Sequence, residues 1–453
     1  MVIRTTQPLN NAFIVKAIND KLRENHRLQR LHDYYVGKQD ILLRRYDDPT
    51  KPNNRIIVNY CKKIADFLTA YLVGVAIQYE APQVILDSLA YNDEAETTQE
   101  IVRNMNIMGL GAELLYTDTD GIPRFTDIDP RESIFITDDS IEANLTAYIR
   151  FYLNTDDPDL YNVVVYTATE YTEYRLTKAV GELRVVCPPC EHFFNDVPAI
   201  MYPNNPEYTG AFEGIVSLQN ALNTVMSDEV NDFESFVDAY LVLKGIAGTQ
   251  PEDISRMKQD RVLLIDDPGS GAEWLIKNVN NAHIKELKES IISKIHELGC
   301  VPDIENLGSF GSSGVALRYK LLHTELQAAK QERAVHKGVQ RRLELLYNVL
   351  TISDPKMGRY SDVNINFTRN YIMLSDEALN QKRLDLSLVD HKILSRETFL
   401  QLHKGMTPDE ASEELRRVIL ETDPYGGGLD SFPAYDDYMN LNINLKRSEA
   451  NAS

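Results

Sequence analysis

The sequence has little of what stabilises secreted proteins or places a chain in a membrane. Its 453 residues include only four cysteines and one tryptophan, and no run of about 18 apolar residues occurs. Sparse cysteines argue against a disulfide framework and favour a reducing compartment. The N-terminus lacks the hydrophobic segment of a signal peptide, so we expect a soluble protein that is synthesised in the cytoplasm.

The sequence motifs of common enzymes are also missing. There is no P-loop, no H-E-x-x-H motif, no G-x-S-x-G elbow and no dinucleotide fingerprint. Residues 308–314 are rich in glycine, but they lack the preceding strand and the Lys-Ser/Thr pair of a phosphate cradle. Acidic pairs at 118/120 and 138/139 lie in turns, where side-chain hydrogen bonds to the backbone explain them. We therefore expect no catalytic residue, no bound metal and no cofactor.

One cysteine pair, Cys187-Pro-Pro-Cys190, has His192 close by and raises the question of a metal or redox site. A closed zinc site needs four ligands, and a second pair at metal spacing is absent from the sequence. No thioredoxin-like strand-helix-strand pattern surrounds the two cysteines. A structural role is the favoured interpretation.

The chain is acidic, with 68 Asp and Glu against 47 Lys and Arg and a net charge of −21. Gripping a nucleic-acid backbone requires concentrated positive charge, so tight sequence-specific DNA binding is not expected. Only residues 315–342 reverse the balance, with seven basic residues against two glutamates: Arg318, Lys320, Lys330, Arg333, Lys337, Arg341 and Arg342 against Glu325 and Glu332. Such runs are usually solvated helix faces that pair with acidic neighbours, which is the interpretation we favour.

Two helical patterns, before and after the Gly/Ser run at 308–314, organise the second half of the chain. In the first, apolar residues from Ile284 to Leu298 recur at spacings of three and four, and Gly299 is a candidate left-handed C-cap. The second begins near a Ser312 or Ser313 cap and extends to Leu350, about 54 Å at 1.5 Å per residue. A rod of this length exceeds an ordinary domain core, so it crosses between layers or lines an assembly, with Gly338 as a candidate bend.

The remaining periodicities predict an α+β protein with an antiparallel meander beside helices. A long helix at 212–239, with an apolar stripe that includes Phe233, and the helix at 281–298 flank a small α/β module at 241–277. A strand at 363–367 has no local partner and is expected to join the N-terminal half. The other expected elements are helices at 12–36, 59–73, 94–108, 376–388, 395–402 and 410–420, a hairpin at 112–128, and strands from 134 to 186.

Five segments spread over nearly the whole chain carry a resemblance to a known family. The first begins with Asn54-Arg-Ile-Ile-Val-Asn-Tyr60 and continues to Gly74, and the others are residues 109–121, 197–205, 313–320 and 365–370. In this order, around two rods and a small module, they resemble the portal proteins, or head-to-tail connectors, of tailed bacteriophages. The resemblance is to the long-tailed type found in phages and prophages of Gram-positive bacteria.

This resemblance implies a ring, typically of twelve subunits, at one capsid vertex, through which DNA is packaged and later leaves. It implies a portal-type fold divided as follows: 1–210 wing, 211–240 and 279–299 stem helices, 241–278 clip, 300–314 tunnel loop, 315–376 long wing helix and returning strand, 377–453 crown and loose tail. The product is expected in the virion, after synthesis in the bacterial host cytoplasm. The rival interpretations are a metal-dependent nuclease and a coiled-coil scaffold protein that forms no ring.

The implied partners are further copies of the chain, double-stranded DNA without sequence specificity, the terminase large subunit, the major capsid and scaffold proteins, and a neck or adaptor protein, but no membrane. The implied tunnel loop presents Leu307, Ser309, Phe310 and Ser312 to DNA. The candidate basic residues of the channel lining are Lys285, Lys288 and Lys294.

Overall fold

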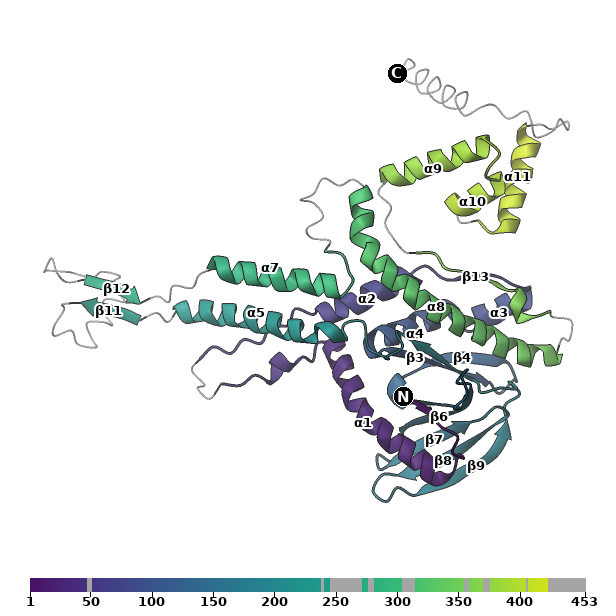
Figure 1. Cartoon of the computed structure of the whole chain (residues 1–453), viewed down its shortest axis with the longest axis horizontal. Helices are drawn as coiled ribbons and strands as arrows, with labels where there is room; N and C mark the ends of the chain where they lie inside the picture. The colour runs from purple at the N-terminus through teal and green to yellow at the C-terminus, as the bar shows by residue number, and fades with distance from the viewer. Residues whose placement is uncertain are drawn as a thin grey trace, which may run out of the picture. The chain divides into compact units, whose positions relative to one another are not determined.

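The computed structural model describes residues 1–46, 51–237, 240–244, 271–275, 281–303, 314–353, 358–369, 375–404 and 406–422. They form two units. One comprises Met1–Ser312 and Ala316–Asn370, and the other comprises Ser313–Val315 and Tyr371–Ser453. The first unit mixes helices and sheets, which confirms the expected α+β class (Figure 1). In the part that is described, no helix is both long and apolar enough to cross a membrane.

The helices of the first unit begin and end close to the positions that the sequence predicts. Asn10 caps the first of them by accepting the Phe13 N–H, and Gly109 ends the fourth in a left-handed conformation. The short third helix was not predicted, because its nine residues span too few turns to show a period. The helices are α1 (Asn11–Val36), α2 (Tyr60–Val73), α3 (Gln83–Tyr91), α4 (Glu94–Met108), α5 (Val216–Val237), α7 (Asn281–Leu298) and α8 (Gly314–Ser353).

The predicted meander is a six-stranded sheet, and α1 covers one of its faces. Its strands follow the order β1 (Val2–Arg4), β5 (Ser133–Thr137), β6 (Leu145–Leu153), β7 (Leu160–Tyr166), β8 (Glu170–Thr177) and β9 (Leu183–Glu191). Only the β1–β5 pair is parallel. Ile14 and Ile18 of α1 pack against alternate apolar residues of β5, β6 and β7, such as Ile149. The apolar residues that alternate along these strands in the sequence therefore form the face of the sheet that α1 covers.

Two smaller sheets complete the described core of this unit. The predicted hairpin consists of β3 (Leu110–Thr117) and β4 (Pro123–Ile128), and β10 (Ala199–Pro203) pairs with the other edge of β3. The unpartnered strand predicted at 363–367 is β13 (Asn364–Asn366), which pairs antiparallel with β2 (Gln78–Glu80). The prediction that it joins the N-terminal half is confirmed, although its partner is this short strand and not the meander.

The long helix α8 runs without interruption through Gly338 and packs its second half into the main core. Val335, Val339 and Leu343 are buried there, together with residues of α2 and α4. A Cβ atom at Gly338 would overlap the ring of Tyr202, which is itself fully buried. The glycine proposed as a bend therefore has a packing role, since it lets β10 approach the helix closely.

Gly299 is likewise not the left-handed cap that its position predicted. The residue with positive φ after α7 is Cys300, at 55°. A side chain at Gly299 would collide with Ile64 of α2. The absence of a Cβ atom at Gly299 lets α7 pack closely against α2, and the chain changes direction one residue later, at Cys300.

The predicted apolar stripes are only partly covered within one chain. Ile291 and Ile295 of α7 are buried against α2, whereas other stripe positions are exposed. The exposed fractions are 72% for Phe233, 49% for Leu287, 58% for Leu298, 48% for Leu322 and 55% for Leu326. Periodicity correctly identified the apolar side of each helix, and Phe233, on the predicted stripe of α5, is not buried by the single chain.

The second unit contains three described helices. They are α9 (Ser375–Asp390), α10 (Arg396–Lys404) and α11 (Pro408–Thr422), as the sequence predicted. His403 of α10 contacts Asp385 of α9 at 2.7 Å, and the pair is largely buried. The tail from residue 423 lies outside the described residues.

Candidate channel elements and the buried networks that hold them

Helices α5 and α7 lie side by side and flank the expected small module in the sequence (Figure 1). In that module β11 (Tyr240–Lys244) pairs antiparallel with β12 (Gly271–Leu275), while the expected helix at 252–258 and strand at 261–266 are outside the described residues. Lys288 of α7 bonds to Glu229 of α5, with 2.6 Å between Nζ and Oε2. The described chain thus contains two helices that pack side by side, and the strand pair lies between them in the sequence.

Each of the three lysines predicted to line a channel has a glutamate partner. Besides Lys288, Lys285 is 3.8 Å from Glu289 and Lys294 is 2.7 Å from Glu297. Lys285 and Lys294 are mostly exposed, and exposed pairs of this kind contribute little stability because water and salt screen them. The positive charge of α7 is therefore offset within the chain, yet these side chains can exchange partners at low cost.

The predicted tunnel-loop residues Leu307, Ser309, Phe310 and Ser312 lie outside the described residues, as does the candidate cap Ser313. The described chain ends before them at Asp303 and resumes at Gly314, the first residue of α8. The helices on either side of the loop are thus placed by the structure.

A ladder of polar side chains on α5 holds the extended segment 54–60, the first segment of the family resemblance. Gln219, Asn223, Ser227 and Asn231 recur every four residues and are buried. Each accepts one backbone N–H from alternate residues of the segment: Asn54 to Asn231 Oδ1 (2.7 Å), Ile56 to Ser227 Oγ (2.9 Å), Val58 to Asn223 Oδ1 (3.0 Å) and Tyr60 to Gln219 Oε1 (3.1 Å).

The ladder works because two repeats nearly match. Four residues of helix rise about 6 Å, and two residues of an extended chain advance about 6.6 Å. Helix side chains at a spacing of four can therefore face every second N–H over several steps. Gln219 also donates to the Val58 carbonyl at 2.7 Å, so these backbone groups of the segment are hydrogen-bonded by side chains of α5 and not by a neighbouring strand.

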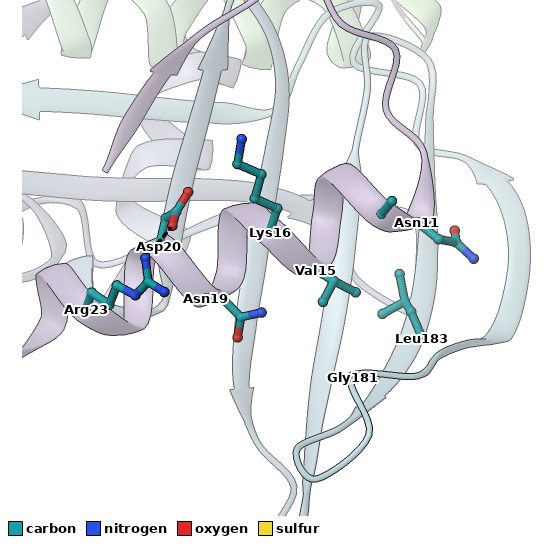
Figure 2. A pocket seen from close by; sticks show the side chains of 9 residues that line it. Asn11, Val15, Lys16, Asn19, Asp20, Arg23, Gly181 and Leu183 are labelled. Carbon is teal, nitrogen blue, oxygen red and sulfur yellow. Dashed lines mark hydrogen bonds and ion pairs between the residues drawn. The ribbon is translucent and has the colours of Figure 1, made fainter.

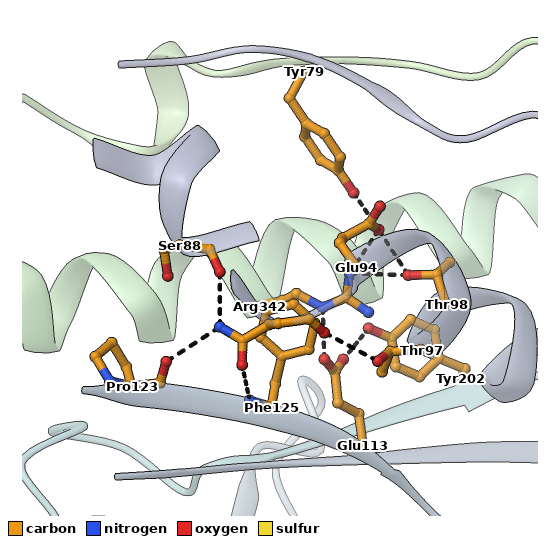
Figure 3. Close-up of polar contacts among 11 residues, drawn as sticks. Tyr79, Ser88, Glu94, Thr97, Thr98, Glu113, Pro123, Phe125, Tyr202 and Arg342 are labelled. Carbon is orange, nitrogen blue, oxygen red and sulfur yellow. Dashed lines mark hydrogen bonds and ion pairs between the residues drawn. The ribbon is translucent and has the colours of Figure 1, made fainter. Parts of the chain in front are cut away.

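A buried arginine connects α8 to the sheet and to α4 (Figure 3). Arg342 is 0% exposed. Its Nε donates to Glu113 of β3 at 2.6 Å, and its Nη1 donates to Glu94 of α4 at 2.9 Å and to Thr98 at 3.0 Å. The guanidinium also lies over the ring of Phe125, 4.5 Å from its centroid.

Two tyrosines complete this network. The hydroxyl of Tyr79 donates to Glu94 at 2.6 Å, and that of Tyr202 donates to Glu113. Burial raises the pKa of Glu113, and the charge of Arg342 opposes that shift. Burial is the largest single influence on Arg342 and disfavours its charge, but Glu113, Tyr202, Glu94 and Tyr79 together outweigh it and hold the pKa of the arginine well above its usual value. The arginine therefore stays charged.

The basic residues of α8 fall into two groups, one on the solvated face of the helix and one buried. Arg341 fits the solvated-face interpretation, since it pairs with Asp196 at 2.6 Å and with Glu344. Lys330, Arg333 and Lys337 are exposed. Arg342 does not fit, and sequence reasoning missed it although a signal existed: it follows Val335 by seven residues and Val339 by three, which places it on the apolar face.

The other polar candidates have local explanations. Asp118 accepts the backbone N–H groups of Asp120 and Ile122, so its turn needs no cation. Both ring nitrogens of His192 are used by the backbone: Nε2 bonds to the Thr167 carbonyl at 2.9 Å, and Nδ1 accepts the Phe194 N–H. Across the residues that the structure describes, no group of three His, Cys, Asp or Glu is placed to hold a metal.

A shallow cleft of about 590 Å³ lies between α1 and the loop from β8 to β9 (Figure 2). Its polar lining comes from α1 and includes Lys16, Asn19, Asp20 and Arg23. Asp20 and Arg23 are 3.4 Å apart and offset each other. The cleft therefore presents a solvated helix face and no concentrated charge.

Comparison with known proteins decides among the interpretations left by the sequence. Residues 15–424 match the family described as phage portal protein, SPP1 Gp6-like. The chain belongs to this family. The portal protein of Bacillus phage SPP1 is 24% identical to it over 460 residues, covering 92% of this chain and 88% of that protein. The resemblance to portal proteins of Gram-positive phages is confirmed, and the nuclease and scaffold alternatives are set aside.

Two solved structures of gene transfer agents are also similar to this portal protein. One is described as the virion of a native gene transfer agent particle, with a TM-score of 0.45, 11% identity, and 77% of this chain and 90% of that chain covered. The other is described as the neck of an empty particle, with a TM-score of 0.41, 14% identity, and 77% and 88% covered. As a phage portal protein, the chain is a non-enzymatic head-to-tail connector of the virion, located at the portal vertex.

Replacing Arg342 by Met should lower the free energy of unfolding by about 3–5 kcal/mol near neutral pH, because Glu113 and Glu94 would be left buried without their cation. The loss should be smaller near pH 5. The charge of Arg342 opposes the burial that raises the pKa of Glu113, so its removal lets that pKa rise further. The folded variant then binds this proton more tightly than the folded wild type, and its loss of stability grows as pH rises. Urea unfolding at both pH values measures this, with the exposed Lys337→Met as control. A loss that does not change with pH would contradict this account of Glu113.

Replacing Asn223 by Leu tests whether the polar ladder on α5 holds the segment 54–60. The Val58 N–H loses its acceptor in a half-buried position, which costs about 1–3 kcal/mol. Amide exchange at Val58 should accelerate while that of Ile64, inside α2, stays slow. Thr224→Val, one residue away on the exposed side of α5, is the matched control. Unchanged exchange at Val58 would show that the ladder does not hold the segment.

Proposed function

We propose that this portal protein assembles into a closed ring of twelve subunits, with a central channel through which double-stranded DNA is packaged and later ejected. The observation that carries the proposal is the exposed apolar surface on α5, α7 and the first half of α8. Phe233, Leu287 and Leu326 belong to regular helical stripes and yet face no neighbour that buries them. Exposed apolar surface on rigid helices is typical of an interface between copies.

Burying such a side chain contributes about 1.5–3 kcal/mol, so several of them per interface support stable assembly. The exposed positions lie on different helices, which favours contact between two different faces of neighbouring subunits. Repeated contacts of that kind produce either a closed ring or an open filament. A closed ring is the form that a single capsid vertex accommodates.

We assign the parts of the ring by the boundaries predicted from the sequence. Residues 1–210 form the wing, 211–240 and 279–299 the stem, 241–278 the clip, 315–376 the long wing helix with its returning strand, and 377–453 the crown and tail. The packed pair α5 and α7 supports the stem assignment, and the strand pair β11–β12 supports a separate clip. The division into two units near residue 371 supports a separate crown.

The charge of the chain suits a conduit in which DNA must slide. Twelve copies at −21 each total about −252, and a net acidic wall repels phosphate instead of binding it. We propose that Lys285, Lys288 and Lys294 line the channel and temper this repulsion locally. Their glutamate partners limit how strongly they hold DNA.

We also propose the partners of each part. The clip faces the terminase large subunit during packaging and a neck or adaptor protein afterwards, while the outer parts contact the major capsid and scaffold proteins. The tunnel loop at 300–314, through Leu307, Ser309, Phe310 and Ser312, approaches the DNA. Three glycines and three serines between two helices make a segment that changes conformation at low cost.

The ring is tested by placing a charge in its expected interface. Leu287→Glu and Leu326→Glu should each shift the protein from rings to folded monomers at micromolar concentration, because a carboxylate would be buried without a partner. Sedimentation velocity and electron micrographs report the change. Val180→Glu is the control, since Val180 is 78% exposed in the β8–β9 loop, away from these helices. A wild-type protein that stays monomeric in both low and moderate salt would refute the ring.

The tunnel loop is tested by replacing Leu307 and Phe310 together by Ser. We expect intact rings in micrographs but incomplete filling or leaking capsids in a packaging assay on the same preparation. Rings that fall apart would indicate that Phe310 packs into a neighbouring subunit. Normal particles would show that neither side chain contributes to DNA passage.

A further inference from the structure

Two thiols lie close together on β9, the last strand of the six-stranded sheet. Cys187 and Cys190 are half-buried, and their Sγ atoms are 3.6 Å apart. In a regular strand, residues three apart point to opposite faces and their Cα atoms are about 10 Å apart. Such a short distance between the two sulfurs therefore requires an irregular strand.

A bulge in β9 supplies that irregularity. Cys190 lies opposite Tyr171 of β8, and Cys187 lies opposite Glu173. Three steps along β9 thus match two steps along β8, so β9 contains one extra residue between the two cysteines, and a second register shift follows between Glu173 and Tyr174 of β8. Since Tyr171 and Glu173 point to the same face, their two cysteine partners do as well.

The two residues between the cysteines fit this arrangement. Pro188 and Pro189 are exposed and have no backbone N–H, so they are tolerated in a bulge on an outer strand. The carbonyl of Pro188 is 3.4 Å from the Cys190 sulfur. The Pro-Pro sequence therefore favours the local conformation that turns both thiols to one side.

Among the residues that the structure describes, no third His, Cys, Asp or Glu is placed to complete a metal site with these thiols. The ring of His192, two residues further on, has both nitrogens hydrogen-bonded to the backbone. The hydrogen bond with Cys190 raises the pKa of the Cys187 thiol. A thiol with a raised pKa, far from a helix N-terminus, does not suit a catalyst of thiol exchange. It suits a pair that exchanges slowly between its dithiol and disulfide forms.

We propose that Cys187 and Cys190 form a reversible dithiol–disulfide site that oxidises on contact with a low-molecular-weight disulfide. One protein thiolate attacks the small disulfide and releases one small thiol, leaving a mixed disulfide on the protein. The second protein thiolate then displaces the other small thiol and forms the Cys187–Cys190 bond. Two protein thiols are oxidised, one small disulfide is reduced, and the two protons pass to the departing thiols.

Closing the bond requires little movement. A disulfide needs about 2.05 Å between sulfurs, so the pair must approach by about 1.5 Å, which side-chain rotation on an outer strand permits. In the reducing host cytoplasm the site stays as two thiols. In a particle released to an oxidising medium, the bond would fix the bulge and the conformation of the outer strand.

The site is tested on the full-length protein with oxidised glutathione as the small disulfide. After exposure, free thiols are alkylated with N-ethylmaleimide under denaturing conditions and peptides are analysed by mass spectrometry. We expect the peptide with Cys187 and Cys190 to escape alkylation and to lose the mass of two hydrogen atoms, with reversal by dithiothreitol. Cys61, which is fully buried with a pKa raised by burial to about 12, is an internal control and should stay alkylatable.

The single variant Cys187→Ser distinguishes formation of the Cys187–Cys190 disulfide from the simple reaction of one accessible thiol. With no second thiol to complete the exchange, Cys190 should retain glutathione as a mixed disulfide. Amide exchange at the β8–β9 edge should slow on oxidation in the wild type and remain unchanged in this variant. The proposal is overturned if wild-type Cys187 and Cys190 both stay alkylatable under conditions that oxidise dithiothreitol, if both retain glutathione, or if they link separate chains.

Discussion

The placement of α8 depends on one buried charge. A guanidinium removed from water is costly unless carboxylates surround it, and Arg342 obtains two of them, Glu113 and Glu94, from elements more than 220 residues earlier in the chain. Tyr202 donates to the second carboxylate oxygen of Glu113, and Tyr79 donates to the same oxygen of Glu94 that Arg342 contacts. Apolar packing alone would tolerate a helix that slides or rotates, whereas this network accepts one position.

The polar ladder on α5 has the same effect for the paired helices. It attaches α5 to an extended segment that leads directly into α2, through bonds to backbone groups that any sequence would possess. Together, the arginine and the ladder use polar contacts inside the subunit to orient its long helices. The apolar faces of those helices stay available for other subunits. A connector needs this division, because its frame must stay rigid while DNA moves past it.

Charged side chains of α7 are likewise paired within the subunit. The channel lysines proposed here are already paired with glutamates, so α7 carries charges of both signs at short range, within a chain whose net charge is negative. At about 0.15 M salt the screening length is about 8 Å, so DNA within a channel senses mostly the nearest side chains. Weak and exchangeable contacts there are compatible with movement in either direction.

The positions of most helices and strands and the family itself were readable from the sequence, because hydrophobic periodicity is a local property and the family segments are spaced along the whole chain. Only the tertiary structure shows which residues cover each face of these helices and strands. Arg342 was hidden in a basic run although it lies on the apolar face of α8, and Gly338 and Gly299 were predicted to be conformational residues although they serve close packing. Phe233, on the predicted apolar stripe of α5, is exposed in the single chain. The tertiary structure also placed Cys187 and Cys190 on one side of β9, through a bulge that is defined only by the register against β8. A local pattern states which side of an element is apolar, but the partner that meets this side comes from residues far away in the chain.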